Sequence, residues 1–333
     1  MNNNIAEGYT LRPFTLDYAQ ATVDLFNAVS RAIIGHDSES LADNITGWKT
    51  PGWDIGSNVR VVFSPEEQIV GYIELWDAAN PFVRKSCYGK VHPAHTGLGI
   101  GNAMLDWVEA KARANIEKCP PGARVVLVQG VPSEDHRAYE LFTMRGYQHD
   151  RTYYRMVIEL TAPPPQPVWP TEIEIRSLVP GKDERAAFSA IYDSFQDHYG
   201  FVKEPFADFL ARWTYFTQNN EHYDPSIFFI AWDNGEVAGV CYCSGSTTED
   251  PDMAWVNTLG VRRPWRKQGL GLALLHHSFN EFWQRGRRKA GLGVDASSLT
   301  GAVRLYERAG MHVQRKFNAY ELELRAGEEL TTH

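Results

Sequence analysis

Cysteine is scarce in this sequence, and long uninterrupted apolar runs are missing. The 333 residues include only four cysteines, Cys87, Cys119, Cys241 and Cys243. They are too few and too unevenly spaced for a disulfide framework or a structural zinc site. Cys241 and Cys243 are two positions apart in a strand-like segment, so both are expected to pack on one face of a core strand. We therefore expect no metal in this protein.

An excess of basic charge is also absent, because the formal net charge is -8. This balance argues against the broad positive surface of a nucleic-acid binder. No segment approaches the roughly 18 consecutive apolar residues of a membrane-spanning helix, and the N-terminal residues lack the basic and apolar regions of a secretion signal. We expect a cytoplasmic globular protein, a monomer or homodimer, with no nucleic-acid or membrane partner.

Proline is concentrated in the segment Thr161–Pro170, which contains five of these residues. Such a segment favours a stiff, extended connection between domains. Similar sequences lie on either side of it: VHPAHTGLGIGNAML begins at Val91, and VRRPWRKQGLGLALL begins 170 positions later at Val261. A repeat this long indicates a duplicated domain rather than a solenoid. We predict an N-terminal domain, a linker, a C-terminal domain and a tail, at residues 1–160, 161–170, 171–327 and 328–333.

Each half contains the same order of predicted elements. A short strand and a helix, such as 184–195, precede a hairpin, which in the second half turns at Asn234-Gly235. A further strand, a glycine-rich turn, an amphipathic helix, a buried strand and a short helix follow. Closing strands are expected at 153–160 for the first half and 317–324 for the second. The fold class is therefore α+β, a mixed sheet flanked by helices, present twice.

The glycine-rich turn of the second half includes Gly269 and Gly271 between a strand and a helix. Converging backbone N–H groups and the helix N-terminus favour an anionic phosphate at such a turn. The alternative is that the glycines serve close packing alone. A dinucleotide-binding fingerprint is excluded because Leu274 stands where its third glycine belongs, and a P-loop is excluded because Gly-Lys-Ser/Thr is absent.

Two segments together resemble the GNAT superfamily of N-acetyltransferases in its tandem-domain form. They are RKQGLG at Arg266–Gly271, which matches the acetyl-CoA motif, and AVRLYERAGM, which contains Tyr306. The resemblance implies two GNAT domains with mostly antiparallel sheets, acetyl-CoA as cosubstrate, and Tyr306 as the acid that protonates the CoA thiolate; packing of Tyr306 in the core is the alternative. It also implies that the cosubstrate is held by Leu259, Gly260, Val261, Arg266, Lys267, Gln268, Gly269, Leu270, Gly271 and Leu272, with Gly97, Gly99 and Gly101 at the matching turn of the first half.

The first half departs from both features. Thr96 stands at the arginine or glutamine position of the motif, and Phe142 stands at the place of the tyrosine. Because phenylalanine cannot donate a proton, the N-terminal domain is predicted to be catalytically degenerate. Tyr139, one helical turn before Phe142, is expected only to pack.

An acceptor amine must lose a proton before it attacks a thioester, so a base is expected near the site. Trp255 stands where the resemblance to tandem members implies an acidic residue. His198, beside Asp197 in a loop after the first helix of the second half, is the candidate, with a surface histidine of no catalytic role as the alternative. We predict acetyl transfer from acetyl-CoA to the primary amine of a small molecule by direct attack in a ternary complex. The alternatives are a non-catalytic acyl-CoA-binding or regulatory module and a peptide or protein N-acetyltransferase.

Overall fold

The computed structural model describes residues 5–170 and 172–332. By their internal contacts, the residues form two compact units. The first comprises residues 1–151 and 318–330, and the second comprises residues 152–317 and 331–333. None of the helices in the described ranges combines the length and the apolar character needed to cross a bilayer.

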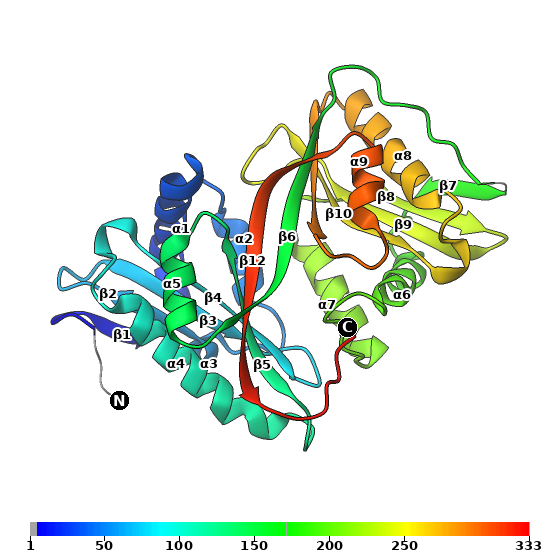
Figure 1. Ribbon diagram of the computed structural model, residues 1–333. Coiled ribbons are helices and arrows are strands. Elements are labelled where there is room, and N and C mark those ends of the chain that lie inside the picture. Colours follow the sequence, from blue (N-terminus) through cyan, green and yellow to red (C-terminus); the bar gives the residue numbers. More distant parts are fainter. Residues whose placement is uncertain (1–4, 171, 333) are drawn as a thin grey trace. The chain divides into compact units, whose positions relative to one another are not determined.

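The first unit contains a sheet in the order β1-β2-β3-β4-β5-β12, in which β4 and β5 are parallel (Figure 1). Ser40 caps α2, because its side chain accepts a hydrogen bond from the backbone N–H of Asp43. Its elements are β1 (Thr10–Pro13), η1 (Leu16–Tyr18), α1 (Ala19–Ile34), α2 (Leu41–Trp48), α3 (Ile55–Asn58), β2 (Val59–Phe63), β3 (Ile69–Trp76), β4 (Arg84–Val91), η2 (Pro93–His95), α4 (Ile100–Ala114), η3 (Asn115–Lys118), β5 (Val125–Pro132), α5 (His136–Met144) and the second part of β12 (His312–Arg325).

The second unit contains a sheet in the order β6-β11-β10-β9-β8-β7. The predicted hairpin forms between β8 and β9, and Asn234 and Gly235 turn it with positive φ angles of 48° and 84°. Its elements are most of β6 (Gln148–Glu159), β7 (Ile173–Ser177), α6 (Glu184–Phe195), α7 (Phe206–Asn219), β8 (Tyr223–Asp233), β9 (Glu236–Ser244), β10 (Met253–Val261), η4 (Arg263–Trp265), α8 (Leu270–Gln284), β11 (Lys289–Asp295), α9 (Ala302–Arg308) and the first part of β12.

The closing strands of the two halves are exchanged. β6 follows α5 in the chain, yet it pairs antiparallel with β11 of the second unit from Glu159 to Tyr153. β12 follows α9, yet it lies beside β5 in the first unit's sheet. Both strands form where we expected them, but the expectation that each half closes its own sheet was wrong. The predicted domain boundaries accordingly differ from the compact units in these two segments.

Helices cover both faces of the second unit's sheet. α8 packs on β8, β9 and β10, and α6 packs on β9 and β10. Gly239 of β9 lies on the face covered by α8, because a Cβ atom there would lie 3.3 Å from Leu274. Gly260 of β10 lies on the face covered by α6, because a Cβ atom there would lie 3.1 Å from Ser194. The two faces of this sheet therefore meet different helices.

Cys241 and Cys243 lie in the core beneath α8, as predicted. Both are fully buried free thiols, with sulfur atoms 3.6 Å apart, and the Cys241 sulfur lies 3.1 Å from the Ser278 hydroxyl. The proline-rich segment 161–170 has neither helix nor strand, and it lies along α8, where Asn280 donates a hydrogen bond to the Pro165 carbonyl at 2.8 Å.

Candidate active site

A cavity opens in the second unit where two parallel strands separate. β10 and β11 pair from Met253 with Lys289 to Val256 with Leu292. Beyond that point, residues 257–261 of β10 and 293–295 of β11 line a cavity of about 1180 Å³. All lining residues belong to the second unit, and α6, α8 and α9 contribute to the walls. The separation of the strands therefore creates a site open to a large ligand.

The glycine-rich turn forms one end of this cavity. Gly269 is the N-cap of α8 with a φ of 88°, a left-handed conformation that favours glycine. The first N–H groups of α8 have no carbonyl partner within the helix, so they suit an anion. Gln268 is the one predicted cosubstrate residue of this half that does not line the cavity, and its amide donates to the Pro264 carbonyl at 3.0 Å. The predicted residues that do line it are Leu259, Gly260, Val261, Arg266, Lys267, Gly269, Leu270, Gly271 and Leu272.

The Arg266 side chain is occupied by protein partners. Its Nε donates to the Val261 carbonyl at 2.9 Å, one Nη donates to the Ser194 carbonyl at 2.9 Å, and both Nη atoms pair with the Asp197 carboxylate. Arg266 also lowers the pKa of Asp197, chiefly through these hydrogen bonds. The motif arginine therefore fastens the loop after α6 to the glycine-rich turn. Asp197 is bound to Arg266 rather than to His198.

Tyr306 lies on α9 and borders the cavity. Its side chain is 8% exposed, and burial raises the pKa of its phenol well above the usual value of 10. Within residues 5–170 and 172–332, its hydroxyl has no hydrogen-bond partner. Tyr306 is therefore a protonated donor at every ordinary pH, available to a group that enters the cavity.

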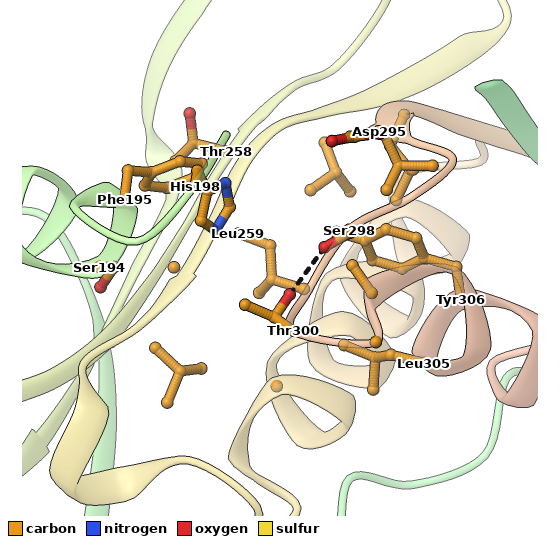
Figure 2. Close-up of a pocket in the computed structure, with 18 of the residues that line it drawn as sticks. Ser194, Phe195, His198, Thr258, Leu259, Asp295, Ser298, Thr300, Leu305 and Tyr306 are labelled. Atoms are coloured by element: carbon orange, nitrogen blue, oxygen red, sulfur yellow. Dashed lines mark hydrogen bonds between the residues drawn. The ribbon is translucent and has the colours of Figure 1, made fainter. Parts of the chain in front are cut away.

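His198 lies in the loop after α6, with its ring centroid 4.3 Å from that of Phe195. Burial lowers the pKa of His198, nearby Asp197 raises it, and Arg266 lowers it further, so the imidazole is neutral at pH 7. Figure 2 shows His198 and Tyr306 on opposite sides of the cavity. The structure thus places in one cavity a neutral imidazole and a protonated phenol that are more than 100 positions apart in the sequence.

Several polar lining residues were missed by sequence reasoning. Asp295 ends β11, and the hydroxyls of Ser298 and Thr300 are 2.9 Å apart in the following loop (Figure 2). A polar residue directly after a buried strand is a signal that could have identified Asp295, since ligands often bind at the ends of parallel strands. Tyr153 and Arg155 come from the exchanged strand β6.

The first unit repeats the glycine-rich turn but has phenylalanine at the position of Tyr306. Gly97 and Gly99 have φ angles of 81° and 76°, and Gly99 caps α4 as Gly269 caps α8. A Cβ atom at Gly101 would lie 3.0 Å from Leu141, so this glycine allows close helix packing. Phe142 is buried at the position of Tyr306.

The model of the "Acetyltransferase (GNAT) family" matches residues 188–311. A mycothiol acetyltransferase of Salinispora tropica is 30% identical over 73% of this chain and 74% of its own length. The crystal structure of a GCN5-related N-acetyltransferase from Sphaerobacter thermophilus is 32% identical, with a TM-score of 0.80 and coverage of 99% of this chain and 100% of that one. A tandem GNAT protein from the clavulanic acid biosynthesis pathway shares the fold, with 16% identity, a TM-score of 0.71 and coverage of 96% and 100%. This chain therefore belongs to the GNAT family of acetyltransferases.

Proposed function

We propose that the second unit transfers an acetyl group from acetyl-CoA to the primary amine of a small molecule in a ternary complex. The observation that carries this proposal is the shared cavity of His198, Tyr306 and the glycine-rich turn at the N-terminus of α8. The turn supplies backbone N–H groups for the pyrophosphate of acetyl-CoA. The first unit, which has Phe142 in place of the tyrosine, keeps the fold without the acid.

The ionisation of the two side chains suits opposite halves of the reaction. His198 is neutral at pH 7 because burial lowers its pKa, so it accepts a proton from the incoming ammonium group. Tyr306 stays protonated because burial raises its pKa, so it donates a hydrogen bond to the departing sulfur. Arg266 and Asp197 act indirectly, because their ion pair holds the loop that carries His198.

The proton and bond changes balance without a further reactant. The ammonium loses one proton through His198, and the free amine nitrogen attacks the thioester carbonyl carbon. The carbon–nitrogen bond forms, the carbon–sulfur bond breaks, and the attacking nitrogen loses a second proton to solvent. The thiolate takes a proton from Tyr306, which solvent restores. The products are an N-acetylated amine, CoA with a free thiol, and one proton released to solvent. The described cysteines are all buried, so direct transfer is favoured over an acetyl-cysteine intermediate.

Binding of acetyl-CoA is tested by calorimetric titration of the whole chain. Gly271→Glu should abolish binding in the second unit, because a carboxylate at the turn repels the pyrophosphate. Gly271→Ala is the steric control: its Cβ atom meets only the flexible Leu305 side chain, at 3.3 Å, and the Val261 side chain, at 3.7 Å. Gly101→Glu makes the same change at the matching turn of the first unit.

Saturable binding by the wild type and the alanine variant, lost in Gly271→Glu, supports the proposal. A panel of small amines is then assayed by release of the CoA thiol. If the folded wild-type protein binds no acetyl-CoA at millimolar concentration, the proposal is wrong. If it binds acetyl-CoA but acetylates peptides and no small amine, the proposed acceptor class is wrong.

A further inference from the structure

The two faces of β11 differ in what they present. On one face, alternate residues are buried in the core with α8 and α9, namely Ala290, Leu292 and Val294. Because side chains alternate along a strand, Gly293 and Asp295 face the other side. On the neighbouring strand β6, Arg155 is opposite Gly293, and Tyr153 is opposite Asp295. Residues opposite each other share a face, so these four residues form one surface of the cavity.

Two glycines of β11, Gly291 and Gly293, differ in what lies over them. At Gly291, a Cβ atom would lie 2.5 Å from the ring of Trp255, so this ring fills the space beside that glycine. At Gly293, a Cβ atom would meet nothing within 4 Å. The Trp255 ring therefore covers Gly291, whereas Gly293 is open to the cavity.

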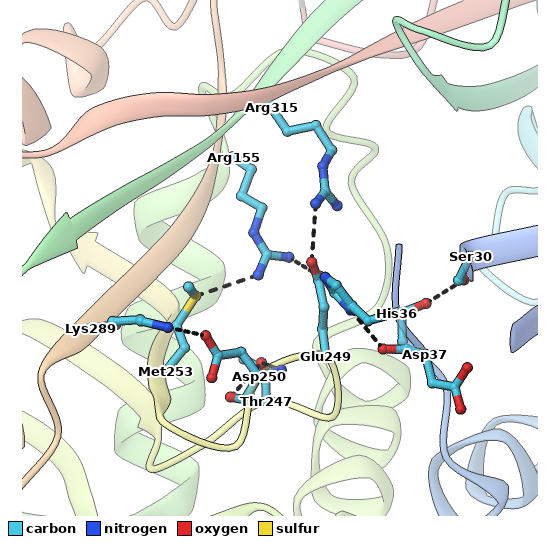
Figure 3. Close-up of polar contacts among 11 residues, drawn as sticks. Ser30, His36, Asp37, Arg155, Thr247, Glu249, Asp250, Met253, Lys289 and Arg315 are labelled. Atoms are coloured by element: carbon cyan, nitrogen blue, oxygen red, sulfur yellow. Dashed lines mark hydrogen bonds and ion pairs between the residues drawn. The ribbon is translucent and has the colours of Figure 1, made fainter. Parts of the chain in front are cut away.

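Arg155 brings positive charge to this opening. Figure 3 shows Glu249 between two guanidinium groups: it pairs with Arg155, and it accepts a hydrogen bond from Arg315 at 3.2 Å. Arg155 also faces the weakly accepting sulfur of Met253 at 3.4 Å and stacks on the Trp255 ring at 4.8 Å. Its Nε atom is fully buried and out of a ligand's reach, whereas the Nη group that faces the sulfur has no stronger acceptor in the part of the chain that the structure describes. This Nη group of a charged side chain is thus left for a ligand.

This surface is too far from the glycine-rich turn to serve the pyrophosphate. Trp255 and Val261, at the two ends of this stretch of β10, are six residues apart, which corresponds to about 20 Å along a strand. Asp295 is a diagonal neighbour of Arg155 across the β6–β11 pair, at a backbone separation of about 7–8 Å. A cationic and an anionic group of one small molecule can therefore reach both residues.

We propose that the acceptor is a small amine that also carries a carboxylate, as an α-amino acid does. The carboxylate accepts a hydrogen bond from the Nη group of Arg155 that faces Met253, the carbon skeleton lies over Gly293 beside Trp255, and the ammonium points toward Asp295 and His198. This inference rests on the proposed function, since it names the class of its acceptor. It assigns Arg155 to acceptor binding and leaves the acetyl-CoA turn unchanged.

The test compares amino acids with their carboxamides, which keep the amine and lose the carboxylate. For the wild type, kcat/KM should be higher for the acid than for the amide of each pair. Arg155→Gln should lower kcat/KM for the acid about 10- to 100-fold, the range for a hydrogen bond to a charged group, and leave the amide little changed. Arg315 still pairs with Glu249 in this variant. Arg287→Gln is the matched control, because it removes one charge from a half-buried position outside the cavity.

A second variant keeps the test decisive if Arg155→Gln does not fold. Gly293→Leu fills the open space over Gly293. Because nothing lies within 4 Å of the Cβ position, the fold should tolerate this side chain. It should abolish turnover of every amine while acetyl-CoA still binds. Equal kcat/KM for acids and amides in the wild type, or normal turnover by Gly293→Leu, would overturn the inference and leave the proposed function intact. A wild type that acetylates no amine would instead refute the proposed function.

Discussion

The carboxyl group of Glu74 in the first unit should make the stability of that unit depend strongly on pH. Glu74 lies on β3 at the wall of a cavity of about 200 Å³ that Trp48 and Trp76 also line. Burial raises its pKa from 4.5 to about 7, the hydrogen bond from Tyr72 opposes the change, and nearby Glu39 adds to it. The folded chain therefore binds the Glu74 proton more tightly than the unfolded chain does.

The sign and the size of the effect follow from this difference. Stabilisation from the Glu74 proton is full below pH 4.5 and is lost as the pH rises through about 7. A difference of about 2.5 pKa units corresponds to about 3 kcal/mol in the free energy of unfolding. Glu74→Gln cannot ionise, and its amide oxygen can still accept the Tyr72 hydrogen bond. The variant should therefore show none of this loss.

The measurement is the melting temperature of the first unit, followed by calorimetry at pH 5 and pH 8. For a unit of this size, about 3 kcal/mol corresponds to about 6–12 °C in melting temperature. The melting temperature of Glu74→Gln minus that of the wild type should therefore be larger at pH 8 than at pH 5 by this amount. Glu66→Gln removes an exposed carboxylate of the same unit, and its melting temperature relative to the wild type should be the same at both pH values. If the difference between Glu74→Gln and the wild type were the same at both pH values, burial of this carboxylate would not govern the stability.

Two predictions concern the proposed acid and base. Tyr306→Phe should lower kcat/KM by about 100-fold or more, while the affinity for acetyl-CoA in a calorimetric titration stays unchanged. Turnover by the variant equal to that of the wild type at every pH would contradict the acid role. Wild-type kcat/KM should fall on the acid side with a midpoint below 6.5, because burial lowers the pKa of His198 and the protonated ring cannot accept a proton. His198→Gln should lose that acidic limb, measured with one amine from pH 5 to pH 8, and a limb that persists would point to another base.

Local features of the fold could be predicted because nearby residues determine them. The hairpin at Asn234 and Gly235 forms because both positions take positive φ angles. α6 spans Glu184–Phe195 as expected. The glycine-rich turn was recognisable for the same reason, since Gly269 adopts a conformation that other residues avoid.

Long-range partners could not be predicted from local patterns. Arg266 stands in a motif beside a phosphate turn, and its sequence position gives no sign that Asp197 and the Ser194 carbonyl occupy its guanidinium. β6 and β12 are both strands that follow a short helix, so the sequence pattern does not indicate which sheet each one joins. That choice depends on pairing across more than 100 residues, as between Tyr153 and Asp295.

The exchange of strands places residues from the first half of the sequence in the wall of the second unit's cavity. Tyr153 and Arg155 belong by sequence to the half that has Phe142 at the position of Tyr306, yet they line the cavity with Tyr306. Through β6, that half also covers the edge of β11 that would otherwise present unpaired backbone groups. The N-terminal half of the sequence therefore supplies part of the cavity wall and the strand that completes the second unit's sheet.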